Sequence, residues 1–189
     1  KVIREYSILF DRWAMLGDRG NNGLLVSTSE NYITNANVQI PAVVDDGWNQ
    51  VQAMSDTFTS LLLQIDETTG DGDVIVYIYG KRLAAFMASL TKNRETVIRT
   101  LMEQKFEGKN VRFIGVPAIV LKGTALENEN GIVVVSDNLT TFEYTQEPTV
   151  RSNGTNEEDE YYWANYVVGS NQVSPDEYGA IIKQPITFA

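Results

Sequence analysis

A regular stripe of apolar residues opens the chain. Between residues 2 and 16 an apolar side chain recurs every three or four positions: Val2, Tyr6, Leu9, Trp13 and Leu16. This spacing predicts one amphipathic helix. Gly17 provides a natural stop, and we expect a polar, turn-rich link over residues 17–23 to follow it.

The next segment changes from polar to helical. Residues 27–44 are mostly Ser, Thr and Asn, so we expect an extended loop there. A helix is predicted after it, capped by Asp45 or Asp46, whose charge suits a helix N-terminus. Its apolar face runs to about residue 65: Trp48, Val51, Met54, Phe58, Leu61, Leu62 and Ile65. Residues 66–73 are then expected to form an acidic turn.

The middle of the chain alternates between strand and helix. Residues 74–79 are a continuous apolar and aromatic run, which predicts a strand buried on both faces. Helical spacing returns between Leu83 and Phe106 and is interrupted at Arg94, so one kinked helix or two consecutive helices fit. Gly108 closes this region.

Beyond residue 110 the pattern is that of strands. A strand over residues 111–121 contains Pro117, which predicts an edge position or a bend, and Asn130-Gly131 predicts a tight turn. The other expected elements are a buried strand at 132–135, an alternating strand at 141–146, a polar acidic loop at 151–160, an aromatic strand at 161–168, a turn-rich link at 169–178 and a short strand at 180–182. We therefore expect an α+β fold with a mixed sheet flanked by helices, in which the two ends of the chain meet.

The composition excludes several classes of function. The 189 residues carry 15 Lys and Arg against 25 Asp and Glu, a net charge of −10. Such a surface repels nucleic-acid phosphates and anionic membranes, so we expect no sequence-specific nucleic acid and no membrane as partners. The chain has no Cys and no His, which removes disulfides, thiol nucleophiles, histidine-dependent triads and the usual zinc sites.

The start of the chain carries no targeting pattern. Residues 1–6 have no signal-peptide layout, lack an initiator Met and open within a helical pattern, so we read the chain as a fragment or a processed product. Elsewhere, no apolar run approaches the roughly 20 residues that a membrane-spanning helix needs.

Two acidic clusters are candidates for binding. The first, Asp66, Glu67, Asp71 and Asp73, could hold a hard cation such as calcium. Its spacing does not match a calcium-binding loop, so a solvated turn is the simpler interpretation. The second, at residues 157–160, could meet a cation or a partner, although a charge run of this kind is usually a solvated loop or hairpin tip.

Other motifs give weaker signals. The triplets at residues 138–140 and 153–155 match the glycosylation pattern, and the Gly-rich residues 17–23 lack the ending of a phosphate-binding loop. The Met and aromatic positions at 86–106 are at the spacing of a helix core rather than a cofactor site. No pair of acids is set in the apolar surroundings that glycoside hydrolysis requires. We therefore assign no catalytic, cofactor-binding or metal-binding residue. We expect the protein to have neither enzymatic activity nor a cofactor.

The order of several pieces is more informative than any one motif. The pieces are the helix end Phe10–Gly17 followed by Gly23-Leu24-Leu25, the helix–strand–helix order of residues 45–106, the Gly-x-Pro strand at 106–117, the segment 130–139 ending in Asn-Leu, and the tail with a strand near 161–168 and Pro175 before Ala180-Ile181-Ile182. This layout resembles the C-terminal two-thirds of a tailed-phage major capsid protein of the Hong Kong 97-like fold, a fold that encapsulins share.

The resemblance implies a division into domains and a function. Residues 1–22 would be the end of the spine helix in the peripheral domain, residues 23–147 the central axial domain, and residues 148–189 return strands of the peripheral domain. The chain would be a structural subunit that self-assembles into hexamers and pentamers of an icosahedral shell enclosing double-stranded DNA. Scaffolding or decoration proteins would be further partners, and the virion subunit would be made in the host cytoplasm.

The resemblance also shows departures. The family's N-terminal arm, extended loop and first part of the spine helix would precede Lys1. Some members form a covalent cross-link between subunits, and we assign no Lys, Asn or acid of this chain to such a link. The long polar segments 27–44, 66–73 and 151–160 are expected to make edge or axis contacts in an assembly.

Three rival functions remain at this stage. An encapsulin-type compartment shell shares the fold. A secreted carbohydrate-binding module is suggested by Trp13, Trp48, Trp163 and nine Tyr, and it predicts exposed aromatic platforms. A carboxylate-based hydrolase predicts a cleft with two facing acids.

Overall fold

A computed structural model describes residues 2–17, 23–26, 32–44, 47–69, 73–91, 110–136, 140–143, 149–156, 159–165, 170–173 and 181–189. The helices are α1 (Val2–Leu16), α2 (Trp48–Thr69), α3 (Lys81–Thr91), the short α5 (Ala118–Leu121) and the 3₁₀ turn η2 (Ala125–Asn128). The strands are β1 (Tyr32–Thr34), β2 (Val38–Ile40), β3 (Val74–Tyr79), β4 (Val111–Gly115), β5 (Asn130–Ser136), β6 (Thr140–Glu143), β7 (Thr149–Asn156), β8 (Asp159–Asn165), β9 (Ser170–Val173) and β10 (Ile181–Phe188).

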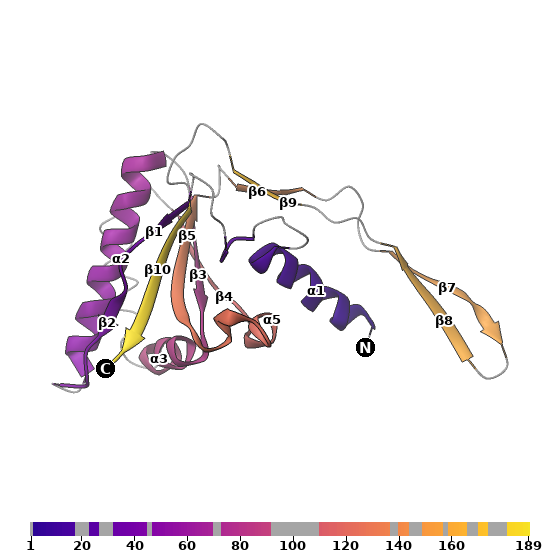
Figure 1. Cartoon of the computed structure of the whole chain (residues 1–189), viewed down its shortest axis with the longest axis horizontal. Coiled ribbons are helices and arrows are strands. Elements are labelled where there is room, and N and C mark those ends of the chain that lie inside the picture. The colour runs from indigo at the N-terminus through magenta and orange to yellow at the C-terminus, as the bar shows by residue number, and fades with distance from the viewer. Residues whose placement is uncertain are drawn as a thin grey trace.

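A six-stranded mixed sheet organises the chain, as the α+β prediction requires. Its order is β1-β10-β5-β3-β4, and β2 also pairs with β10. The β5 strand runs antiparallel to β3 and β10, whereas the β3–β4, β1–β10 and β2–β10 pairs are parallel. Figure 1 shows α2 along one side of this sheet, with α1 and α5 on the other side.

The first face of the sheet packs against α2 and α3. Alternate residues of β3 and β5, such as Val76 and Val134, point to this face and are fully buried. Met54, Phe58 and Leu61 of α2 cover them, also fully buried. This cluster confirms the predicted apolar face of the second helix, except for Trp48, which begins α2 with 51% of its surface exposed.

The opposite face packs against α5 and the segment that follows α1. Tyr79, Val133 and Val135 lie on this face with Leu25 and Leu121. Since β3 and β5 bury both faces, the prediction of a doubly buried strand at residues 74–79 is confirmed.

The end of α1 is closed as its sequence predicts. Gly17 has a φ of 79°, a left-handed conformation that glycine adopts without steric cost. The N–H groups of Leu24 and Leu25 donate to the carbonyls of Ala14 and Met15 at 3.0 and 2.8 Å. The last turn of α1 is therefore bonded to the buried Leu-Leu pair, while residues 18–22 lie outside the described residues.

The second helix is longer than predicted. It continues to Thr69, so Asp66 and Glu67 belong to α2 and not to an acidic turn. Nothing in this stretch breaks a helix before Gly70, and apolar spacing marks only the part of a helix that meets the core. The proposed caps Asp45 and Asp46 lie outside the described residues.

The predicted loop at 27–44 contains two short strands. In β1, Tyr32 pairs with Ile181, and in β2, Ile40 pairs with Phe188. Each strand is only three residues long, too short for a strand pattern to show in the sequence. Both strands form by pairing with β10, which is far along the chain. Residues 27–31 lie outside the described residues.

Pro117 lies between the end of β4 and the start of α5, so it does not bend a strand. The predicted strand 111–121 is wrong beyond Gly115, since β4 ends there and residues 118–121 form α5. Pro117 has a φ of −60° and no N–H to donate, so it stands before the first helical residue. Of the predicted helical region up to Phe106, the structure describes α3, and residues 92–109 lie outside the description.

The turn predicted at Asn130-Gly131 is wrong. Both residues open β5, where Gly131 pairs with Tyr79 on one side and Pro185 on the other. A Cβ at Gly131 would lie 2.5 Å from the Tyr79 Oη, so glycine is required here by a close approach and not by a turn.

The C-terminal third contains more strand than predicted. The acidic loop at 151–160 and the link at 169–178 are corrected by the β7–β8 hairpin and by β9, which pairs with β6. The strand predicted at 161–168 is β8, which ends at Asn165. Polar strands such as β7 show no apolar alternation, so sequence pattern missed them. Figure 1 shows the β7–β8 hairpin projecting away from the main sheet.

The last strand is longer than expected and central. The prediction of a short strand at 180–182 is corrected to β10, which lies between β5 and the β1 and β2 edge. The expected meeting of the two ends of the chain is wrong, because the start of α1 and the end of β10 lie apart in Figure 1, and it is β1, at residues 32–34, that pairs with β10.

Candidate functional site

The first acidic cluster does not form a cation site in the described residues. Asp66 and Glu67 lie on α2, and Asp71 lies outside the description. Asp73 accepts hydrogen bonds from the backbone N–H and the side-chain Nδ2 of Asn110 at 3.3 and 3.2 Å. Asp73 therefore joins the start of β4 to β3. No group of three metal-ligating acids is found in the part of the chain that the structure describes.

The second acidic cluster lies at a hairpin end. Asp159 and Glu160 open β8 and pair with Asn156 and Thr155 of β7. Residues 157–158 lie outside the described residues. The placement agrees with the interpretation of this run as a hairpin tip.

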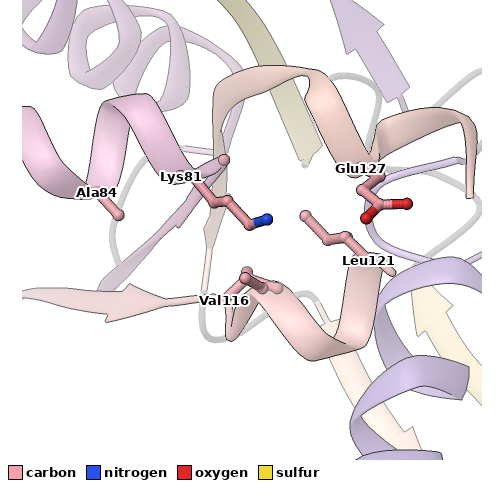
Figure 2. A pocket seen from close by; sticks show the side chains of 7 residues that line it. Lys81, Ala84, Val116, Leu121 and Glu127 are labelled. Carbon is pink, nitrogen blue, oxygen red and sulfur yellow. The ribbon is translucent and has the colours of Figure 1, made fainter. Parts of the chain in front are cut away.

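A hollow of about 220 Å³ lies between the start of α3, the end of β4 and α5. Its lining consists of Gly80, Lys81, Ala84, Val116, Ala118, Leu121 and Glu127. In Figure 2 the Lys81 amine and the Glu127 carboxylate approach this space from opposite sides, with the apolar side chains of Val116 and Leu121 between them. Glu127 already accepts a hydrogen bond from the Gly123 N–H at 2.8 Å, so its carboxylate also fixes the turn after α5.

Two buried phenols occupy the face of the sheet opposite α2. The hydroxyl groups of Tyr32 and Tyr79 have no hydrogen-bond partner among the described residues. Burial raises the pKa of both phenols, and the neighbouring Glu129 carboxylate raises the pKa of Tyr79 further. The Lys183 amine lies 5.9 Å from the centre of the Tyr79 ring and donates to the Leu25 carbonyl at 3.2 Å. These phenols stay protonated at neutral pH and cannot act there as bases.

The aromatic residues do not form a common platform. Trp13 lies on α1, which contacts α5, whereas Trp48 begins α2 on the opposite side of the sheet. Trp163 lies on β8 in the projecting hairpin. The three tryptophans therefore do not combine into one sugar-binding surface.

The remaining motifs are not assembled into a site. Asn153 and Thr155 lie within β7, while residues 138–139 of the other glycosylation triplet lie outside the description. Most of the Gly-rich segment 17–23 also lies outside it. Phe86 and Met87 pack against the core, as the helix-core interpretation predicts.

The comparisons with known proteins give similarity in structure alone. No family model and no curated protein matches the sequence. The capsid of Myoviridae phage XM1 superposes with a TM-score of 0.61 over 96% of this chain, at 15% sequence identity. A virus-like particle from Pyrococcus furiosus superposes with a TM-score of 0.53 over 97% of this chain, at 13% identity. The chain has a capsid-type fold.

This capsid-type chain is shorter than its structural neighbours. It spans 61% of the phage XM1 chain and 62% of the Pyrococcus furiosus chain. One of these neighbours is a phage capsid and the other is a virus-like particle. The described helices include none long and apolar enough to cross a membrane.

The end of the segment 27–44, a segment that the sequence analysis expects to make edge or axis contacts, is apolar and exposed. Val43 and Val44 are 67% and 55% exposed beside the exposed Trp48. The segment is held in place, because Asn49 accepts from the Val44 N–H at 3.0 Å and donates to the Ala42 carbonyl at 2.6 Å.

Proposed function

We propose that the chain is a structural, non-enzymatic subunit of a virus capsid with the Hong Kong 97-like fold. Copies assemble into hexamers and pentamers of an icosahedral shell that encloses double-stranded DNA in the virion of a bacteriophage or prophage. The subunit is made in the host cytoplasm, with scaffolding or decoration proteins as further partners.

One observation carries this proposal. Superposition on the phage XM1 capsid extends over 96% of the chain, although sequence identity is only 15%. Because the match includes the sheet, the helices and the strand-rich C-terminal third, the similarity extends over the whole architecture of the chain. The resemblance in the order of sequence pieces points independently to the same family.

The proposal includes a division of the chain. Residues 1–22 end the spine helix, residues 23–147 form the axial domain and residues 148–180 belong to the peripheral domain. The final strand β10 pairs with β5 and thus lies in the main sheet. We therefore propose that β10 belongs to the axial domain, whereas the resemblance alone implies that residues 148–189 are all return strands of the peripheral domain.

A compartment shell of the encapsulin type is the second candidate. The superposition on the Pyrococcus furiosus virus-like particle favours it. Both candidates predict closed shells, but the first predicts double-stranded DNA within them and the second predicts a protein cargo. The carbohydrate-binding alternative is disfavoured by the separation of Trp13 and Trp48 on opposite sides of the sheet.

Negative-stain electron microscopy of the complete protein product that contains this chain tests the proposal. Closed shells, or free rings of five and six copies, are the expected result. A monodisperse monomer at high concentration would contradict the shell function. Nuclease-protected DNA in particles purified from the natural host then supports the virus capsid, and a co-purifying protein cargo without DNA supports the compartment.

A further inference from the structure

One end of the main sheet is remote from the C-terminal strands. Of its six described strands, five run in the same direction and β5 runs against them. The strands β2, β3, β4 and β10 therefore all finish at one end, which we call the carboxyl end of the sheet. The chain leaves for β6 and returns from β9 at the opposite end. Figure 1 shows β2, α3 and α5 at the carboxyl end, away from β6 and β9.

Exposed apolar side chains gather at this carboxyl end. Among the described residues, six large hydrophobic side chains are exposed, and four of them belong to segments that follow β2 or β4: Val43, Val44, Trp48 and Ile119. Apolar groups that gather on one exposed part of a protein mark an interaction surface. The carboxyl end is therefore the part of the described surface to examine for a partner.

The segment after β2 is held in one conformation by its own chain. We define the apolar segment as residues 41–44, Pro-Ala-Val-Val. Asn49 accepts from the Val44 N–H at 3.0 Å and donates to the Ala42 carbonyl at 2.6 Å. The Gly47 N–H donates to the Val44 carbonyl at 2.9 Å. Because these bonds fix the segment in the free subunit, docking it costs little conformational entropy.

The hollow beside α3 is a receiving surface at the same end of the sheet. The Lys81 amine and the Glu127 carboxylate approach it from opposite sides, with the apolar side chains of Val116 and Leu121 between them (Figure 2). Its volume is about 220 Å³. A cavity of about 150 Å³ is large enough for a benzene ring, so the hollow has room for a valine side chain.

The apolar segment of a copy lies too far from the hollow of the same copy to enter it. The hollow is lined by residues that follow β3 and β4, which are three and four strand spacings from β2 in the sheet order. At about 4.8 Å per spacing, the separation is roughly 14 to 19 Å. Since Asn49 anchors the segment beside β2, an apolar segment that fills the hollow must come from another molecule.

Charge complementarity favours a second copy of this chain as that molecule. The apolar segment is uncharged, and the sequence continues directly with Asp45 and Asp46. Adjacent Cα atoms are about 3.8 Å apart, so an acid accompanies Val44 wherever the segment docks. The Lys81 amine attracts this acid and the Glu127 carboxylate repels it. The Val44 end of the segment is therefore directed to the Lys81 side of the hollow.

We infer that the apolar segment of one copy docks in the hollow of a second copy, with Val43 and Val44 packed on the apolar lining. This inference rests on the proposed shell function and names the surfaces through which neighbouring subunits meet. The two surfaces are different, so each copy can donate its segment to one neighbour and receive a segment from another. Repeated contacts of this kind close a ring when the rotation between copies allows.

Cysteine cross-linking gives the first test, because this chain has no Cys. The complete protein product, with any cysteine outside this chain replaced by serine, is made as a Val44→Cys variant and as an Ala84→Cys variant. The two variants are assembled together and treated with a short bis-maleimide, and mass spectrometry identifies the linked peptides. We expect links between positions 44 and 84 in the mixture and no linked pair in either variant alone, because identical surfaces do not meet.

A matched pair controls for chance collisions between thiols. Leu63 is 50% exposed, close to the 55% of Val44, and lies on α2 outside the apolar segment. A mixture of Leu63→Cys and Ala84→Cys should therefore give no link. Rings without a link between positions 44 and 84, links within a single variant, or equal linking in the control mixture would overturn the inference.

Polar substitution of the apolar segment gives a second test. Val43→Ser with Val44→Ser changes two exposed side chains, so the subunit itself should fold as the wild type does. Ring formation, measured by native mass spectrometry, should fall at least about tenfold, because two valine side chains no longer gain from burial. Leu63→Ser is the control and should leave ring formation unchanged. An equal loss in this control would overturn the contact.

Filling the hollow tests the contact from the receiving side. Ala84 is exposed and lines the hollow, whereas the neighbouring Ala85 is exposed on the same helix and does not line it. Ala84→Gln should reduce ring formation at least about tenfold, because its longer side chain occupies the space that a valine needs. Ala85→Gln should form rings as the wild type does, and equal behaviour of the two variants would overturn the inference.

Combining the two changes shows whether they act on one contact. If the segment and the hollow meet, Val43→Ser and Val44→Ser together with Ala84→Gln should cost no more than the more damaging change alone. Fully additive losses would show two separate contacts and would overturn the inference. Failure of the unmodified protein to form rings or shells would instead count against the proposed function itself.

Discussion

Asn130 caps the N-terminus of α3 by a hydrogen bond to Leu83, although 47 positions separate the two residues. The Asn130 Oδ1 accepts hydrogen bonds from the backbone N–H groups of Leu83 and Arg82 at 3.0 and 3.1 Å. Gly80 makes this approach possible, since a Cβ on it would lie 2.5 Å from the same Oδ1. The start of β5 and the start of α3 thus form one hydrogen-bonded unit.

Removing this cap should weaken α3. We expect Asn130→Ala to lower the free energy of unfolding by about 1 to 2 kcal/mol, because two N–H groups at the helix start lose their acceptor. Urea denaturation measures the change. Asn128→Ala, at an exposed position in η2, is the matched control and should cost less than about 0.5 kcal/mol. Equal losses in the two variants would contradict the capping role.

The Asn130-Gly131 pair shows a limit of prediction from local sequence. An Asn-Gly pair is a strong local signal for a hairpin turn, yet here Asn130 serves a helix from another part of the chain and Gly131 makes room for a tyrosine. A local sequence pattern cannot predict a residue whose role is set by contact with a distant element. Where burial is continuous and local, as in β3 and most of α2, the pattern predicts the element correctly.

Gly131 should tolerate no side chain. A Cβ would lie 2.5 Å from the Tyr79 Oη and 2.8 Å from the Gln184 carbonyl oxygen, and neither can retreat within the packed sheet. We expect Gly131→Ala to cost about 1 to 3 kcal/mol of stability. Gly115→Ala is the control, because nothing lies within 4 Å of the added methyl group. A Gly131 variant as stable as the Gly115 variant would show that the contact is not restrictive.

Gln184 should stabilise the edge of the sheet that β1 and β2 form beside β10. Its buried side chain donates to the Ala36 carbonyl at 2.6 Å, and its Oε1 accepts from Asn35 at 3.3 Å. Asn35 also donates to Gln64 of α2 at 2.8 Å. These contacts fix the residues between β1 and β2.

Replacing Gln184 by Met removes these bonds while keeping a similar volume. We expect a loss of about 1 kcal/mol, because the hydrogen bonds to the Ala36 carbonyl and the Asn35 side chain are lost, and faster hydrogen exchange in β1 and β2. Gln39→Met on β2, where the side chain is exposed, should change neither quantity appreciably. Unchanged exchange in the Gln184 variant would mean that backbone pairing alone holds this edge.

Alkaline pH should destabilise the fold through Tyr32 and Tyr79. Burial raises the pKa of both above the ordinary value of 10.0, so the unfolded chain ionises first. Their contribution is fully present below pH 10.0 and declines as the pH rises above it. Denaturant unfolding at increasing pH measures this decline.

Tyr32→Phe with Tyr79→Phe should flatten that alkaline decline. At neutral pH the double variant should lose less than about 1 kcal/mol, because neither hydroxyl has a hydrogen-bond partner among the described residues. An alkaline decline as steep as that of the wild type would assign the effect to other groups.

The surface of the segment 27–44 was less predictable in detail than the core. Val43 and Val44 follow a polar segment, and only the placement of α2 and β2 shows that they are exposed together. Likewise the strands β1 and β2 depend on β10, so no window around residue 35 contains the information that forms them. Surfaces and edges are set by the arrangement of distant elements, which periodicity does not report.

The position of β10 near the end of the chain also determines when the sheet can be completed during protein synthesis. Tyr32 cannot pair with Ile181, nor Ile40 with Phe188, until the ribosome has released residues almost 150 positions downstream. Such non-local pairing slows folding, because the entropy cost of closing a long loop comes before any stabilising hydrogen bond is formed. The sheet of a growing chain therefore stays open between β5 and its early strands until residue 188 has been synthesised. A nascent subunit therefore cannot complete the β1 and β2 edge of its sheet before translation has passed that point.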